Sequence, residues 1–153
     1  MANIVANIAK GRVVEYYNRV KSNDPANSAL ILVPIESSGL ESDATLIDKD
    51  DLAAWLSGTT NEQTTMGRKT LTDAELASLP APDDGNDRYD VSLPTVTWSA
   101  ATGNAIAKIL VCYDSDTTSG TDSNIIPLTQ FDFAQTPSGA DIQMTTGVFF
   151  RAS

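Results

Sequence analysis

The most apolar stretch of the chain runs from Ala105 to Tyr113 and is interrupted only by Lys108. A strand that is covered on both faces has a nearly continuous apolar pattern of this kind, so we expect it to be the central strand of a sheet. A second strand is predicted at 125–133, where Pro127 cannot donate to a ladder and favours an edge or a bulge. The polar segment 114–124 joins the two. This pattern predicts a hairpin around which the other elements are arranged.

The first helix is predicted from Val13, Tyr17 and Val20, whose spacing places them on one helical face. The β-branched and aromatic content of this segment equally suits a strand. We favour the helix, ending at 23–25, because proline disfavours helical backbone at the residue before it. The apolar run 29–35 then predicts a buried strand.

Two further helices are predicted before residue 80. The segment 49–57 carries an apolar stripe, and Asp48 is its expected N-cap. Thr72 and Glu75 have the spacing of a capping box at the start of a short helix. The segment 59–67 between these helices is rich in polar residues and predicts a loop.

Strands dominate the pattern after residue 87. Apolar and polar residues alternate over 89–93, and the apolar phase shifts after Pro94, which indicates a bulge or a crossing between two sheets. A last strand is predicted at 142–151. In that strand we expect Val148 to share a face with the other apolar side chains, with Gly147 as a possible bulge. Phe149 points the opposite way, which indicates a strand that is covered on both sides or that meets a partner.

These elements predict one α+β domain over residues 1–153. Its parts are a basic N-terminal arm and helix (1–22), an α-containing front (23–80) and a β-rich back (87–153). We expect the short helices of the N-terminal half to pack on a mainly antiparallel sheet or small β-barrel formed largely by the C-terminal half.

Composition narrows the function classes. The chain is 41% hydrophobic and 20% charged, which is ordinary for a globular protein. It has no histidine and one cysteine, Cys112, so histidine-based catalytic triads, His- or Cys-ligated zinc within one chain and a disulfide framework are excluded. Cys112 lies in the most apolar strand and is expected to be an inert buried thiol. We expect no cofactor and no enzymatic activity.

The net charge of −10 is unevenly distributed. Residues 1–21 have a net charge of +3, whereas residues 22–153 have a net charge of −13. The acidic body argues against nucleic acid as a partner. The basic segment is either a solvated helix face or a surface that docks on an acidic partner, because complementary charge steers association. The candidate partner-binding residues are Lys10, Arg12, Tyr16, Arg19 and Lys21.

The loop with Asp114, Asp116 and Asp122 offers oxygen ligands that suit calcium. It lacks the early glycine and the closing glutamate of the helix-loop-helix calcium site. We therefore favour a solvated loop and keep a calcium-binding module as the alternative. Adjacent acids such as Asp83 and Asp84 point apart on a strand or turn, so they do not predict a glycosidase pair.

The N-terminus does not have the pattern of a signal peptide, and no apolar run reaches the length of a membrane span. We expect a soluble protein made in a cytoplasm, without a membrane partner.

Five segments of the chain together resemble small structural proteins of tailed bacteriophages that are encoded among the head genes. They are 9–13, 23–31, 45–48, 111–114 and 124–128. The resemblance extends over most of the chain and consists of ordinary residues rather than a reactive motif. It carries over no catalytic residues.

The resemblance implies capsid decoration, in which a small protein binds the outer shell between major capsid subunits and stabilises it. The implied partner is the major capsid protein, with a possible homotrimer because capsid subunits meet at threefold positions. The implied location is the virion, after synthesis in the host bacterial cytoplasm. The alternative within the virion is a tail or head-tail connector protein.

Overall fold

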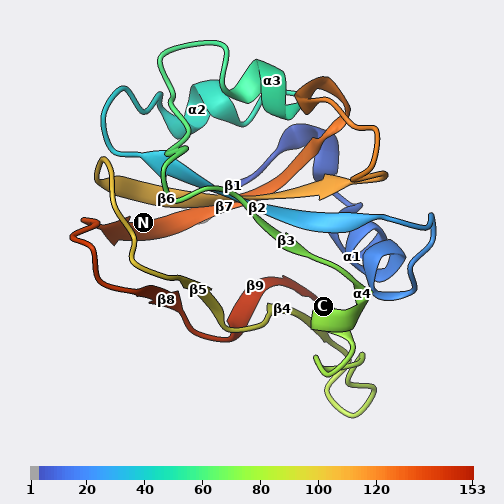
Figure 1. Cartoon of the computed structure of the whole chain (residues 1–153). Helices are drawn as coiled ribbons and strands as arrows, with labels where there is room; N and C mark the ends of the chain where they lie inside the picture. The colour runs from blue at the N-terminus through green and yellow to red at the C-terminus, as the bar shows by residue number, and fades with distance from the viewer. Residues whose placement is uncertain (1–3) are drawn as a thin grey trace.

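A five-stranded antiparallel sheet forms the centre of the protein in the computed structural model, which describes residues 4–153 (Figure 1). The strand order is β1-β7-β6-β2-β3. In that order the strands are Ile4–Val5, Ile126–Gln135, Ile106–Asp114, Ala29–Glu36 and Lys69–Leu71. The predicted central strand is confirmed, because β6 lies between β7 and β2 and its apolar side chains are covered on both faces.

The hairpin of β6 and β7 contains the bulge that its proline predicts. The register between the two strands shifts after Val111, so that Cys112 is paired with Pro127. A residue without an amide donor is accommodated where the ladder is already irregular. The bulge therefore lets a proline occupy an interior strand of the sheet.

Short helices cover one face of the sheet (Figure 1). These are α2 (Asp43–Leu46), α3 (Leu52–Trp55) and the short 3-10 helices η1 (Asn7–Ala9) and η2 (Asp122–Asn124). The helix predicted at 49–57 is present as α3 but is shorter, and the prediction of Asp48 as its N-cap is wrong. Asp51 caps α3 instead, and its carboxylate accepts a 2.7 Å hydrogen bond from the amide of Ala54. Asp48 is engaged elsewhere, since it accepts a hydrogen bond from the Asn7 side chain.

Two small antiparallel ribbons lie beneath the other face (Figure 1). One ribbon pairs β4 (Tyr89–Leu93) with β9 (Gly147–Ala152), and the other pairs β5 (Val96–Trp98) with β8 (Ile142–Met144). The break expected at Pro94 is confirmed. The predicted continuous strand at 142–151 is divided opposite that break. There the Thr146 amide donates a hydrogen bond to the Thr95 hydroxyl, so the two paired segments of the chain bend at the same place.

Ile142 and Met144 of the predicted last strand face the core as expected, but the expected faces are reversed at Val148 and Phe149. Phe149 is buried, with 6% of its surface exposed, whereas Val148 is 49% exposed. The ladder between β4 and β9 shifts register after Val91. Such a bulge changes which side chains face the core, and it lies close to Gly147, where the sequence indicated a possible bulge.

Helices α1 (Val13–Lys21) and α4 (Asp73–Leu76) pack together at one end of the sheet. The predicted first helix is confirmed, and its backbone ends before the proline-containing turn. The capping box of Thr72 and Glu75 is also confirmed at the start of α4. Lys21 links α1 to the segment that follows α4, because its ammonium group donates to the carbonyl of Leu79 at 2.7 Å.

The segment 59–67 forms a loop, as predicted, but it packs closely against the sheet. Gln63 is buried, and its amide group donates to the carbonyls of Thr102 and Asn104 at 2.8 and 3.2 Å. The backbone amide of Gln63 donates a 2.9 Å hydrogen bond to the carbonyl of Pro34 in β2. Satisfied polar groups therefore replace apolar packing along this side of the fold.

The architecture is α+β, with short helices packed on an antiparallel sheet. In the described part of the chain the sheet is open and closes into no barrel. Each layer contains one fully buried tryptophan: Trp55 in the helical layer and Trp98 in the ribbon layer. The core is thus built on both faces of one sheet.

Cys112 provides a test of this central strand. The thiol is buried, and burial raises its pKa. We expect its reaction with a chromogenic disulfide reagent at pH 8 to be slower by about a thousandfold or more in the native protein than in denaturant, because reaction requires opening of the core. Cys112→Ala is the blank. Rapid reaction of the native protein would contradict the placement of β6.

Candidate partner-binding surface

A short ladder of charges follows the exposed side of α1. The carboxylate of Glu15 accepts hydrogen bonds from Arg12 at 3.2 Å and from Arg19 at 3.0 Å. Hydrogen bonding to Arg12 is the main cause that lowers the pKa of Glu15. All three side chains are exposed, so the pairs themselves add little stability. They do hold the two guanidinium groups in a defined position on the surface.

Tyr16 does not lie on the surface, contrary to its exposed appearance in the sequence. Only 4% of it is exposed, and its ring stacks on Tyr113 of β6 with 4.6 Å between centroids. The guanidinium carbon of Arg12 lies 4.6 Å from the centroid of the Tyr16 ring. Because Tyr16 is buried, its ring is a fixed surface against which the guanidinium group of Arg12 lies.

Tyr89 is also buried, and its hydroxyl donates a 3.0 Å hydrogen bond to the side-chain oxygen of Asn18. Its hydroxyl is therefore used within the fold.

The basic segment divides into accessible and structural residues. Lys10, Arg12 and Arg19 are exposed and lie on α1 or just before it. Lys21 is committed to the carbonyls of Leu79 and Pro80. The accessible cations of this surface, named the α1 face below, are therefore Lys10, Arg12 and Arg19.

The carboxylates of the 114–124 loop are each used separately. Asp114 is buried, and its carboxylate accepts a 3.0 Å hydrogen bond from the backbone amide of Asp116. Asp116 in turn accepts hydrogen bonds from Thr118 and Ser119, and these lower its pKa. Within residues 4–153 no group of three or more acidic or cysteine side chains is arranged to hold a metal ion.

Arg68 is the main partner of the third acid in this loop. Its guanidinium group binds both oxygens of Asp122, at 2.6 and 2.9 Å, and both oxygens of Glu62, at 2.6 and 2.8 Å. This contact joins the 59–67 loop to η2 and lowers the pKa of Asp122. No local sequence signal identifies it, because Arg68 and Asp122 are far apart in the chain.

An apolar groove of about 270 Å³ opens between the sheet and the ribbons. We refer to it as the β9 groove. Its lining residues are Leu93, Phe131, Asp132, Met144, Thr145, Gly147, Val148 and Phe149. Val148 lines it and is the one large apolar side chain exposed in the described part of the chain.

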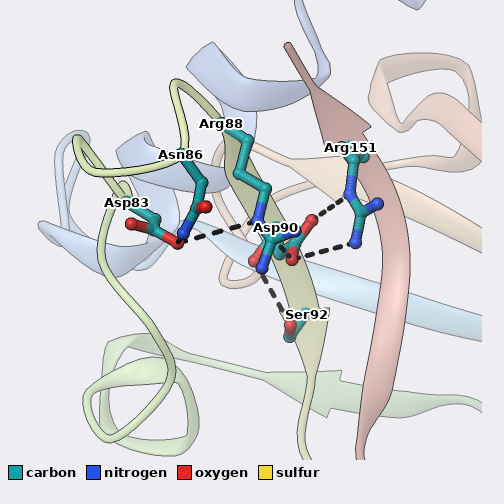
Figure 2. A network of polar contacts seen from close by, with 6 residues as sticks. All are labelled: Asp83, Asn86, Arg88, Asp90, Ser92 and Arg151. Carbon is teal, nitrogen blue, oxygen red and sulfur yellow. Dashed lines mark hydrogen bonds and ion pairs between the residues drawn. The ribbon is translucent and has the colours of Figure 1, made fainter.

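A polar network borders the other end of the β4-β9 ribbon (Figure 2). Arg151 of β9 binds Asp90 of β4, and this hydrogen bonding is the main cause that lowers the pKa of Asp90. The Nε atom of Arg88 lies 3.5 Å from a carboxylate oxygen of Asp90 and 3.7 Å from a carboxylate oxygen of Asp83. The acids of this network are thus paired with arginines and hold the two strands of the ribbon together.

Comparison of this chain with protein-family models, with curated proteins and with solved structures finds no match. No helix among residues 4–153 is long and apolar enough to cross a membrane.

The contact between Arg68 and Asp122 predicts a pH-dependent loss of stability. We expect Asp122→Asn to lower the free energy of unfolding by about 1–2 kcal/mol at pH 7, because a partly exposed charged hydrogen bond is weakened. The pKa of Asp122 is lower in the folded protein, so its contribution is complete above the ordinary value of about 4 and is lost as the pH falls below it. The difference from wild type should therefore shrink between pH 4 and pH 2.

Urea denaturation at pH 7, 4 and 2.5 measures this difference. Asp84→Asn, at an exposed loop position, is the matched control and should match wild type at each pH. A constant difference between Asp122→Asn and wild type at all three values would show that the charge of Asp122 is not what stabilises the contact.

Proposed function

We propose that this chain is a non-enzymatic virion protein that binds the outer surface of a tailed-phage capsid and stabilises the shell. The resemblance to phage head proteins supplies the identity of the partner, the major capsid protein. The structural observation that carries the proposal is the α1 face, where Arg12 and Arg19 are held by Glu15 and Arg12 rests on the ring of Tyr16.

A fixed cationic face on an acidic protein suits binding to an acidic protein surface. The two guanidinium groups need little ordering when a partner arrives, which lowers the entropic cost of association. The remaining acidic surface repels wrong partners and copies of the chain in other orientations. These properties serve attachment to a shell better than they serve catalysis.

The proposed arrangement at the capsid is one copy or a trimer at the junctions between capsid subunits. Binding at such a junction links neighbouring subunits, so part of the free energy of binding stabilises the shell. The mature particle is the proposed location.

Co-sedimentation with undecorated, expanded capsid shells tests the proposal. We expect the wild-type chain to pellet with shells at micromolar concentration. Arg19→Gln should bind the shells more weakly, by about threefold or more, because one positive charge that faces the acidic partner surface is lost. The fold should be preserved, since an exposed helical ion pair adds little to stability. Raising the salt concentration should weaken binding of the wild type.

Lys49→Gln removes a cation outside the α1 face and is the matched control. Absence of wild-type co-sedimentation would contradict capsid binding. Immuno-labelling confined to the tail of the virion would instead favour a tail or connector protein.

A further inference from the structure

We infer that Asp84 and Gly85 form a site of spontaneous covalent modification, at which the aspartyl residue of the folded protein is converted to isoaspartyl. The site lies at the tip of the loop between Asp83 and Arg88. The inference is independent of the proposed function, because it concerns a reaction of the chain with itself and with water. It adds a chemical change that alters one surface loop as the protein ages.

The pair 84–85 is the one place in the sequence where glycine follows aspartate, and glycine follows asparagine nowhere. In this reaction the backbone nitrogen of the next residue approaches the side-chain carboxyl carbon of the aspartate. Glycine has no Cβ, so it leaves that approach open and gives the backbone the freedom to rotate into it. The sequence thus contains a single site of this most reactive kind.

The surroundings of Asp84 leave both reacting groups unengaged. Asp84 and Gly85 are exposed and lie in a turn. Among residues 4–153, neither the Asp84 carboxylate nor the Gly85 backbone amide forms a hydrogen bond or ion pair. A Cβ placed on Gly85 would meet only a carboxylate oxygen of Asp83, at 3.5 Å. The space around the attacking amide is therefore open.

The base of the loop is fixed while its tip is not. The backbone amide of Asp83 donates to the carbonyl of Arg88 at 2.8 Å, and the amide of Arg88 donates to the carbonyl of Asp83 at 3.2 Å. The side-chain amide of Asn86 donates to the Asp83 carboxylate at 2.7 Å (Figure 2). Residues 84 and 85 can therefore rotate into the reactive geometry without opening the loop at its base.

Other aspartates of the chain lack this freedom. Serine, which is also small, follows Asp114 and Asp122. Asp114 is buried, however, and both carboxylate oxygens of Asp122 are bound by Arg68. Asp87 is exposed, but the amide of Arg88 that follows it already donates a hydrogen bond. The fold therefore directs the reaction to Asp84.

The reaction has two steps. In the first, the Gly85 nitrogen bonds to the side-chain carboxyl carbon of Asp84, the amide proton and the carboxyl hydroxyl leave together as water, and a five-membered succinimide ring forms. In the second, water adds to one of the two ring carbonyls. Addition at the main-chain carbonyl breaks its bond to the Gly85 nitrogen and leaves a free carboxylate there, so the chain now runs through the former side chain. Addition at the other carbonyl restores aspartate.

Isoaspartate keeps the negative charge of Asp84 but lengthens the loop backbone by one methylene group. The backbone amide of Asn86 donates to the carbonyl of Asp83 at 3.2 Å, across residues 84 and 85, so the added backbone atom disturbs this hydrogen bond. The β4-β9 ladder begins at Tyr89 and holds the chain beyond the loop. We therefore expect changes in amide chemical shift that are confined to 83–88.

Ageing of the full chain for weeks at neutral pH and physiological temperature, followed by peptide mapping, tests the inference. The isoaspartyl peptide has the same mass as the aspartyl peptide. An isoaspartyl methyltransferase with labelled S-adenosylmethionine marks only its new free carboxylate. We expect the peptide with residue 84 to carry at least about tenfold more label than the peptides with residues 114 and 122. In denaturant those two should gain label, because their carboxylates are then released.

Gly85→Ala is the test variant. Its Cβ fits without a clash, and it hinders the approach of the nitrogen, so labelling at residue 84 should fall by about tenfold or more. Asp84→Glu keeps the charge but must close a larger ring, and it should lose the label at this position. Asp87→Glu, at an exposed position of the same loop, is the matched control and should be labelled as wild type. Dispersed amide spectra show that the variants are folded.

Three results would overturn the inference: no label at residue 84 of the aged native protein, equal label at residues 84, 114 and 122 before denaturation, or undiminished label in Gly85→Ala. None of these results bears on capsid binding, which co-sedimentation of freshly prepared protein measures separately. Failure of the proposed function would likewise leave the modification site unchanged.

Discussion

The pairing of β2 with β6 is the constraint on which the rest of the fold depends. It joins Ala29–Glu36 to Ile106–Asp114 along almost their whole length, and so connects the front of the chain to its back. Both covering layers are laid on the surface that this pairing creates, with α2 and α3 on one face and the two ribbons on the other (Figure 1). Because the contact is long-range, the chain must close a large loop before the core yields its stabilisation.

Lys108 shows how this central strand accommodates a charge. Its side chain is 3% exposed, and the ammonium group lies 2.8 Å from Asp43 of α2 and 3.6 Å from Asp132 of β7. A lysine removed from water is costly unless carboxylates compensate it. The two acids come from the helical layer and from the neighbouring strand, so the pairing also constrains how α2 sits on the sheet. The buried charge thus contributes to the specificity of the packing.

The sequence predicted those features that depend on local chemistry. The apolar pattern of β6, the bulge at Pro127 and the capping box at Thr72 all follow from residues close together in the chain. The exposure of Val148 was predicted wrongly because it depends on a bulge in a ladder between distant strands. Tyr16 was placed on the surface because its cover, Tyr113, comes from the other half of the chain. The exposed cations of the α1 face could be identified from the sequence by their charge, whereas the β9 groove could not, since residues of four separate strands line it.

The two buried tryptophans have a consequence for observing the molecule. Trp55 lies in the helical layer, and Trp98 lies in the ribbon layer with its indole nitrogen 3.0 Å from the carbonyl of Gly67. The chain therefore contains one tryptophan on each side of the sheet, in different polar surroundings. Emission from each can be isolated by replacing the other with phenylalanine. Loosening of either layer, during folding or on binding of a partner, can in this way be followed optically without an added label.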